Sequence, residues 1–380
     1  MKLLAVTGSR ADWGLLLPVF RRLCDDPRFD AILTITGQHL EPGPQASLAA
    51  IVRAGFDTSH SVDIGLGSDD GAVALSAAMG RATAGVGALI GQTAPDMILV
   101  LGDRYEILGA VNAALICNVP VAHLCGGDVT EGAMDDAIRH AITKLSALHF
   151  VPTDVAAARV AQMGENPDHI YTVGSTGLDH IREVAPMTPA DLWADLGLAP
   201  ADQSFLVTFH PPTLSQDVPE QCDALIAALR AFPQAALIVT GSNADPGART
   251  IDEKMQEFVA SRPNAVFRTS LGSQRYFAAL GAVDVVIGNS SSGLYEAPSF
   301  DVPTVNIGDR QARRVRATSV LDCGSDTGSI IAAMTQALAG DYSGTVNPYG
   351  DGHAAARIID VLAAVKDPRA LIRKSFVDIA

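Results

Sequence analysis

An apolar segment that ends in a Gly-Asn turn and three serines has the residue types needed to hold a phosphate. We expect Ser290, Ser291 and Ser292 to place hydroxyls and backbone N–H groups at a helix start, where the helix dipole favours an anion. Glu296 follows about one helical turn later, within reach of the hydroxyls of a sugar or ribose. Phosphate and polyol recognition side by side predict a nucleotide-sugar site, and a serine-rich helix cap is the alternative interpretation.

Three aspartates stand where paired carboxylates would carry out acid–base chemistry. Asp103 lies just beyond the apolar segment 97–101, and Asp128 lies just beyond the segment 119–124. Asp135 belongs to a dense polar stretch that runs into a helical segment. Carboxylates whose surroundings push their pKa values apart can divide the roles of acid and base. Helix capping explains each aspartate taken singly, but together at one sheet edge they favour a catalytic site.

Basic residues recur at the predicted turns of this acidic protein. Arg10 opens the first helical segment, without the GxGxxG spacing of a dinucleotide-binding fingerprint. Arg104 follows Asp103, and Arg310 and Arg313 belong to a stretch with four arginines between residues 308 and 316. Because guanidinium groups pair well with phosphate oxygens, we predict a diphosphate clamp, and a solvated basic surface is the alternative.

His210 stands between the apolar segment 205–209 and a Pro-Pro pair. The prolines would fix the turn and leave the imidazole facing a cleft. An imidazole placed there would donate a proton to a leaving phosphate, and a structural histidine is the alternative.

These residues must be positioned by alternating strands and helices. Short continuous apolar runs separated by Ala-rich helical segments indicate buried parallel strands in βαβ units. The pattern occurs twice and predicts an α/β protein with two doubly wound, Rossmann-like domains. The predicted strands are 3–7, 31–36, 97–101, 119–124, 148–151 and 170–173, then 205–209, 236–240, 265–268, 283–287, 304–307 and 320–323.

A Pro- and Ala-rich break separates the two series of strands. We therefore predict an N-terminal Rossmann-like domain at 1–175, a linker at 176–200 and a C-terminal Rossmann-like, nucleotide-sugar-binding domain at 201–353. Residues 354–380 would begin with a last helix that packs back on the N-terminal domain. In open α/β sheets, ligands bind at the carboxyl ends of the strands, so a cleft between two such edges is the expected active site.

Composition narrows the class of protein. The 380 residues are 48% hydrophobic and carry a net charge of −15, which predicts a globular protein that binds neither nucleic acid nor an anionic membrane. Five scattered cysteines without a CxxC argue against disulfides and a structural zinc site. The N-terminus is interpreted as a strand rather than a signal peptide, and no apolar stretch is judged long enough to span a bilayer. We expect a cytoplasmic protein.

Eight strings resemble the hydrolysing UDP-N-acetylglucosamine 2-epimerases of sialic acid and related nonulosonic acid biosynthesis. They keep their order over nearly the whole chain, and they are VTGSRADWG, LGDRYE, GGDVTEGAMDDAIRHAITKLSALHF, FHPPTLS, GSNAD, IGNSSSGLYE, NIGDRQARR and NPYGDG. The resemblance implies a GT-B-like fold with the active site in the interdomain cleft. It also implies anti elimination of UDP from UDP-GlcNAc, a 2-acetamidoglucal intermediate, and hydration to ManNAc. The resemblance implies no metal or redox cofactor. It implies a homodimer or a homotetramer.

The resemblance also implies roles for single residues. UDP contacts would fall on Arg10, Arg104, His210, Ser290, Ser291, Glu296 and Arg310, with His210 assisting the departure of UDP. Catalytic carboxylates would fall on Asp103 and Asp135. Some relatives carry a Glu before the Gly-Gly pair where this chain has Cys125. A thiol is a poor substitute for that carboxylate, and Asp128 is the nearby candidate to replace it.

Other readings stay open at this stage. The same chemistry on UDP-2,4-diacetamido-2,4,6-trideoxyglucose, in the legionaminic acid pathway, would share these motifs. A non-hydrolysing epimerase is the second alternative, although that group resembles GTRPE where this chain has Gly8-Ser9-Arg10-Ala11-Asp12. A GT-B glycosyltransferase and a non-catalytic nucleotide-sugar sensor are the others.

Overall fold

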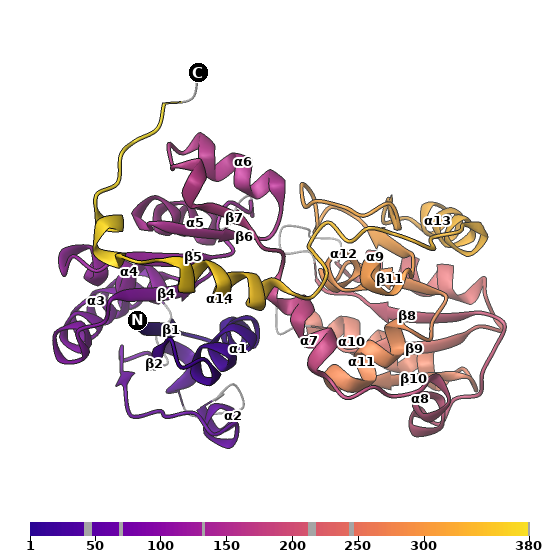
Figure 1. Ribbon diagram of the computed structural model, residues 1–380. Helices are drawn as coiled ribbons and strands as arrows, with labels where there is room; N and C mark the ends of the chain where they lie inside the picture. Colours follow the sequence, from indigo (N-terminus) through magenta and orange to yellow (C-terminus); the bar gives the residue numbers. More distant parts are fainter. Residues whose placement is uncertain (42–47, 68–70, 131–133, 212–217, 243–246, 379–380) are drawn as a thin grey trace. The chain divides into compact units, whose positions relative to one another are not determined.

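The structure is a computed structural model that describes residues 1–41, 48–67, 71–130, 134–211, 218–242 and 247–378. Two compact units make up the chain (Figure 1): unit 1 is Met1–His180 with Tyr349–Ala380, and unit 2 is Ile181–Pro348. Each unit holds one parallel sheet with helices, so the predicted pair of Rossmann-like α/β domains is confirmed. Parts of three quoted strings, at 131–133, 212–215 and 243–245, lie outside the described residues.

Unit 1 has, within the described ranges, a seven-stranded parallel sheet of order β3-β2-β1-β4-β5-β6-β7. Its strands are β1 (Lys2–Thr7), β2 (Asp30–Thr36), β3 (Ser61–Val62), β4 (Met97–Leu101), β5 (Val121–Leu124), β6 (Leu148–Val151) and β7 (Ile170–Thr172). Its helices are α1 (Arg10–Asp25), α2 (Leu48–Arg53), α3 (Ala72–Thr93), α4 (Tyr105–Ile116), α5 (Met134–Leu145), α6 (Asp154–Gln162) and α14 (Ala354–Ala364). Short 3-10 turns are η1 (Gly37–His39), η2 (Pro167–His169), η3 (Thr176–Leu178) and η5 (Pro368–Ile372).

Unit 2 has, counting only described residues, a six-stranded parallel sheet of order β10-β9-β8-β11-β12-β13. The strands are β8 (Ser204–Thr208), β9 (Ala236–Thr240), β10 (Ala265–Arg268), β11 (Val285–Gly288), β12 (Thr304–Ile307) and β13 (Val320–Cys323). The helices are α8 (Pro189–Leu196), α9 (Val218–Arg230), α10 (Ala248–Ala260), α11 (Gly272–Leu280), α12 (Ser292–Tyr295), η4 (Ala297–Phe300) and α13 (Thr327–Ala339). Helix α7 (Asp179–Glu183) begins in unit 1 and ends in unit 2.

The central strands are apolar on both faces because each sheet is covered by helices on both sides. In β1, Leu3 and Ala5 join the core beneath α1 and α14, whereas Leu4 and Val6 join the core beneath α3 and α4. Successive side chains of a strand point to opposite faces, so a continuous apolar run fills two cores at once.

All the predicted strands are present, with bounds that shift by two residues at most. Strand β3 was not predicted, because two residues are too short for a periodic pattern. All five cysteines lie in described ranges and are unpaired.

Residues 176–200, expected as a linker, contain η3, α7 and α8. Leu192, Trp193 and Leu196 of α8 are buried in a core of unit 2. At the other end of the chain, α14 contacts α1 in unit 1 (Figure 1), and its Ile358 and Leu362 are fully buried there.

Among the described residues, helix α3 comes nearest to the uninterrupted apolar stretch of membrane-spanning length that was expected to be absent, although Arg81 interrupts its apolar residues. This Ala- and Gly-rich helix is long and apolar enough to cross a bilayer, judged by length and composition alone. Its periodicity is that of a helix packed on a neighbour, since Ala78, Ala82 and Val86 are fully buried in the core shared with α4.

The strand order reverses at β1/β4 in unit 1 and at β8/β11 in unit 2. Such switch points leave a crevice at the carboxyl ends of the strands, where ligands bind in doubly wound folds. Gly288, at the end of β11, has φ 137°, and a Cβ there would lie 1.8 Å from the Thr208 carbonyl oxygen. Only glycine therefore lets the ends of β8 and β11 approach this closely.

The buried Asp179 carboxylate stabilises the start of α14 from a segment far away in sequence. It accepts hydrogen bonds from the backbone N–H groups of Ala354 (3.1 Å) and Ala355 (3.0 Å). We predict that Asp179→Ala lowers the free energy of unfolding by about 2 kcal/mol, because two buried donors lose a charged acceptor. Urea unfolding measures this. Asp360→Ala, on the exposed face of α14, is the control and should change it by less than about 0.5 kcal/mol; equal losses in both variants would contradict the assignment.

Candidate functional site

The end of β4 is joined to the end of β1 through Arg104 and Glu106. Arg104 caps α4, and its Nε donates to Glu106 Oε1 at 2.6 Å, while the Glu106 side chain is fully buried. Gly8 lies directly over this carboxylate, since a Cβ at Gly8 would be 2.4 Å from Glu106 Oε1. The first helix turn thus approaches a buried ion pair rather than a plain apolar surface.

Arg139 of α5 draws the predicted catalytic aspartates together. Its guanidinium donates to the Asp103 carboxylate, to the Asp128 carbonyl oxygen at 2.9 Å and to Thr130 Oγ1 at 3.1 Å. Arg139 is only 6% exposed. One buried cation therefore connects the end of β4, the loop after β5 and helix α5.

Asp135 lies on the first turn of α5 and belongs to the same electrostatic group. Partial burial and the neighbouring Asp103 carboxylate raise its pKa, while Arg104 and Arg139 oppose the rise. The structure therefore brings Asp103, Asp128 and Asp135 to one edge of the unit 1 sheet, which is the placement predicted from the sequence.

Cys125, directly after β5, has an unusual backbone conformation. Its φ is 64°, in the left-handed region that few non-glycine residues adopt. Burial, then the charges of Asp128 and Asp103, raise the pKa of the thiol to about 12. A thiol that stays protonated at neutral pH is a poor proton acceptor.

Two members of this group were not singled out from the sequence. Glu106 sits inside a quoted string without a role, and Asp12 was read only as part of the N-terminal string. Asp12 is 8% exposed, and burial raises its pKa to about 6 against the opposing effect of Arg104. Its position on the first turn of α1, just after a strand end, is the signal that would have found it.

Arg10 is the first residue of α1 and is exposed. Its side chain forms no hydrogen bond or ion pair with another described residue. The structure therefore places Arg10 at the correct sheet edge but outside the paired cluster.

In unit 2, Asn289 holds the predicted histidine turn. Its side-chain Oδ1 accepts from the His210 N–H at 2.7 Å, and its Nδ2 donates to the His210 carbonyl oxygen at 2.8 Å. The Asn289 carbonyl oxygen in turn accepts from Arg310 Nη1 at 3.3 Å and from Gln311 Nε2 at 2.9 Å. His210 and Arg310 are thus joined through the residue that follows β11.

The serine turn differs from the expected helix start. Helix α12 has four residues, so its dipole is smaller than that of the longer helix we expected. Two of the serine hydroxyls accept hydrogen bonds: Tyr276 OH donates to Ser292 Oγ at 2.5 Å, and the Ser292 backbone N–H donates to Ser290 Oγ at 3.4 Å. Ser291 is the residue just before α12.

Glu296 is half-buried, and its Oε2 is buried without a hydrogen-bond partner among the described residues. Burial raises its pKa to about 7, while a hydrogen bond to Ser292 opposes the rise. A carboxyl group with an open acceptor can bind a polyol, so the role predicted for Glu296 stays a prediction.

The four arginines after β12 do not act alike. Arg310 contacts Asn289 as above, and Arg313 is exposed with φ 64°. Arg314 stacks over the Tyr295 ring at 5.6 Å, and Arg316 pairs with Asp322 at 2.7 Å. Arg310, Arg314 and Arg316 therefore each contact a described residue, and the exposed Arg313 is the fourth arginine of the predicted clamp.

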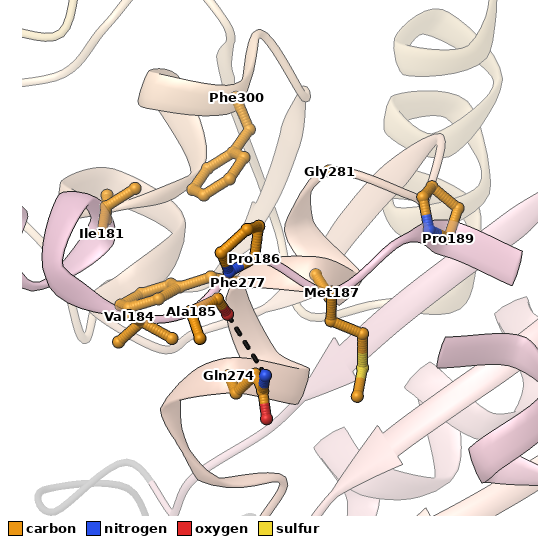
Figure 2. A pocket seen from close by; sticks show the side chains of 11 residues that line it. Ile181, Val184, Ala185, Pro186, Met187, Pro189, Gln274, Phe277, Gly281 and Phe300 are labelled. Atoms are coloured by element: carbon orange, nitrogen blue, oxygen red, sulfur yellow. Dashed lines mark hydrogen bonds between the residues drawn. The ribbon is translucent and has the colours of Figure 1, made fainter. Parts of the chain in front are cut away.

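Unit 2 also has an apolar pocket that is lined by other residues (Figure 2). Its lining includes Met187, Phe277 and Phe300, and Gln274 Nε2 donates there to the Ala185 carbonyl oxygen at 3.2 Å. None of the predicted site residues lines it. The part of the chain that the structure describes also holds no cluster of three His, Cys, Asp or Glu suited to a metal ion.

Two doubly wound units, each with polar residues gathered at its switch point, define the class of two-domain, GT-B-like enzymes. The chain belongs to the UDP-N-acetylglucosamine 2-epimerase family, whose model matches residues 21–363.

Three relatives span most of the chain. The polysialic acid biosynthesis protein P7 of Escherichia coli is 34% identical over 96% of this chain and 94% of its own. The UDP-N,N'-diacetylbacillosamine 2-epimerase (hydrolyzing) of Legionella pneumophila is 32% identical over 96% of each. The UDP-N-acetylglucosamine 2-epimerase of Neisseria meningitidis serogroup B is 27% identical over 88% of this chain and 87% of its own.

Solved structures share the fold. A putative UDP-N-acetylglucosamine 2-epimerase from Listeria monocytogenes has a TM-score of 0.79 at 20% identity and covers 95% of each chain. The Neisseria meningitidis UDP-GlcNAc 2-epimerase bound to UDP-GlcNAc has a TM-score of 0.74 at 19% identity, over 95% of this chain and 99% of that one. The predicted GT-B-like architecture is confirmed.

Removing the Arg139 guanidinium should destabilise unit 1. We predict that Arg139→Met lowers the free energy of unfolding by about 2 kcal/mol, because the Asp103 carboxylate and two further acceptors lose their donor. The comparison in urea unfolding is Arg275→Met, which breaks the exposed pair of Arg275 with Asp195 and should cost less than about 1 kcal/mol. If both variants lose the same small amount, Arg139 does not hold the cluster together.

Proposed function

We propose that this protein is a hydrolysing UDP-sugar 2-epimerase that converts UDP-GlcNAc and water to ManNAc and UDP. The observation that carries the proposal is the cluster at the β1/β4 switch point, where Arg139 and Arg104 hold several carboxylates together in a chain of this family. Inverting C2 requires a proton to leave one face of the sugar and return to the other. Carboxylates in unlike environments suit that exchange.

The proposed reaction has two halves. In the elimination, a carboxylate removes the C2 proton, the C–H electron pair forms the C1=C2 bond, and UDP leaves with the electrons of the C1–O bond. In the hydration, water adds at C1 and a proton is delivered to C2 on the opposite face. Free ManNAc is then released beside UDP.

The two carboxyl roles fall on Asp103, Asp128 and Asp135 in this proposal. Asp103 is oriented by its hydrogen bond with Arg139. Asp135 has a raised pKa, which suits a group that must hold and return a proton. Asp128 is the candidate to take the place of the glutamate that Cys125 replaces, and its backbone is held by Arg139.

Recognition of UDP is assigned to arginine, serine, glutamate and histidine side chains. Arg10, Arg104, Arg310 and Arg313 would contact the diphosphate. The hydroxyls of Ser290, Ser291 and Ser292 would bind phosphate oxygens, and Glu296 would accept from ribose hydroxyls. His210, fixed at its backbone by Asn289, would assist the departure of UDP.

Hydrolysis is favoured over simple isomerisation by two observations. The Legionella pneumophila relative is named a hydrolysing enzyme and is similar to this chain over 96% of its length. The N-terminal string Gly8-Ser9-Arg10-Ala11-Asp12 also differs from the GTRPE of the non-hydrolysing group. A glycosyltransferase would have no need of the carboxylates gathered around Arg139.

A second substrate is supported by the same relative. UDP-N,N'-diacetylbacillosamine carries a second acetamido group at C4 and lacks the C6 hydroxyl, but its C1 and C2 are those of UDP-GlcNAc. The elimination would therefore be identical, and only the pocket around C4 and C6 would differ.

The test is product analysis with each UDP-sugar supplied separately to the purified protein. Release of UDP together with a free 2-epimerised sugar supports the proposal and identifies the preferred substrate. A product that retains UDP would place the chain with the non-hydrolysing epimerases. Binding of both sugars without turnover would favour a sensor.

Asp103→Asn separates catalysis from binding. We predict that turnover falls by about 100-fold or more, because a proton-transferring carboxylate is lost, while the affinity for UDP stays within about threefold. Asp168→Asn, on an exposed turn of the same unit, serves as the control and should retain full activity. Full activity in the Asp103 variant would remove its catalytic role.

A further inference from the structure

Asp12 is a buried carboxyl with an open acceptor. It lies on the first turn of α1 and is 8% exposed, and its Oδ2 is buried without a hydrogen-bond partner among the described residues. An ionised carboxylate left this way loses its hydration without full compensation, which favours the protonated form. None of the roles proposed above uses this side chain.

The charges that face Asp12 come from the ends of β1 and β4. Ser9, the cap of α1, accepts from the Asp12 N–H at 3.3 Å, and the two side chains are also hydrogen-bonded. Across the switch point stand Arg104, Glu106 and Asp103. Burial raises the pKa of Asp12 to about 6; Arg104 and Ser9 oppose the rise, and the two neighbouring carboxylates add to it.

Arg104 is therefore shared between two buried carboxyls. Glu106 holds its Nε at 2.6 Å, and Asp12 contributes a second negative charge whenever it is ionised. With both ionised, the cation is neutralised before any ligand arrives. With Asp12 protonated, Arg104 retains more of its charge for an incoming anion.

We propose that Asp12 is a positioning residue that takes up a proton when a nucleoside diphosphate binds at Arg104, which commits the guanidinium to the phosphates. The inference rests on the proposed function, in which Arg104 contacts the diphosphate. The carboxyl acts as a charge regulator: it is ionised in the free protein above its own pKa and neutral in the complex.

The direction of the pH dependence follows from this exchange. The negative charge of the ligand raises the pKa of Asp12 above its value in the free protein. Below about pH 6, Asp12 is protonated in both states and contributes no proton uptake. Above that pH the free protein must gain a proton to bind, so the affinity falls by up to about tenfold per pH unit until the pKa of the complex is passed.

The experiment is calorimetric titration of the full chain with UDP at pH 7 and 8, in buffers of different ionisation enthalpy. The dependence of the heat on the buffer gives the number of protons taken up. On binding UDP, the wild type should take up more protons than Asp12→Asn, with a difference of at most one proton. The variant, which mimics the protonated form, should bind UDP more tightly than the wild type at pH 8 and with a flatter pH profile.

Titration of the UDP phosphates and of Glu296 contributes to both proteins and cancels in the difference. Asp25→Asn, an exposed carboxylate at the other end of α1, is the matched control and should behave as the wild type. Asp12→Glu restores a titratable carboxyl and should recover the proton uptake.

If Asp12→Asn fails to fold, Ser9→Ala provides a second test of proton uptake by Asp12. Loss of the Ser9 hydroxyl raises the pKa of Asp12, so the pH at which uptake begins should move upward. Equal proton uptake in the wild type and Asp12→Asn, or an unmoved profile in Ser9→Ala, would overturn this inference alone. No binding of UDP by the wild type would overturn both the inference and the proposed function.

Discussion

The guanidinium of Arg139 is the interaction on which the unit 1 site depends. It reaches from α5 to the Asp103 carboxylate and the Asp128 backbone, which come from two different strand ends. Several carboxyl groups at one sheet edge repel one another, and a buried cation among them offsets that repulsion. Arg104 likewise offsets the repulsion between carboxylates at the neighbouring strand end, and Glu106 is its hydrogen-bond partner. The carboxylates at this sheet edge are thus held by two arginines that are themselves fixed by hydrogen bonds.

In unit 2 the residues at the switch point are positioned mainly by neutral hydrogen-bonding groups. Asn289 pairs with both backbone groups of His210 and presents its own carbonyl oxygen to Arg310 and Gln311. Gly288 permits this by letting two strand ends approach. The His210 turn is thus positioned through its backbone groups. Unit 1 therefore gathers charged side chains at its switch point, whereas the contacts at the switch point of unit 2 are made largely through backbone groups.

The sequence predicted most of the fold because buried parallel strands leave continuous apolar runs, and β3 escaped because two residues carry no pattern. It also placed the polar residues at strand ends, since topology alone brings those ends together. It could not show which buried side chains pair. Arg316 was grouped with the phosphate clamp although it pairs with Asp322, and Asp12 was passed over although it is buried beside Arg104. Such pairings depend on three-dimensional distances that a linear pattern does not contain.

Proton exchange at C2 of the sugar is the step that this arrangement of carboxylates exists to perform in our account. The most direct measurement is proton NMR of the protein with UDP-GlcNAc in D2O, without added cofactor. We predict that the released ManNAc carries deuterium at C2, because the proton removed in the elimination is replaced from solvent-exchanged groups. ManNAc that retains its C2 proton would contradict elimination and hydration at this site.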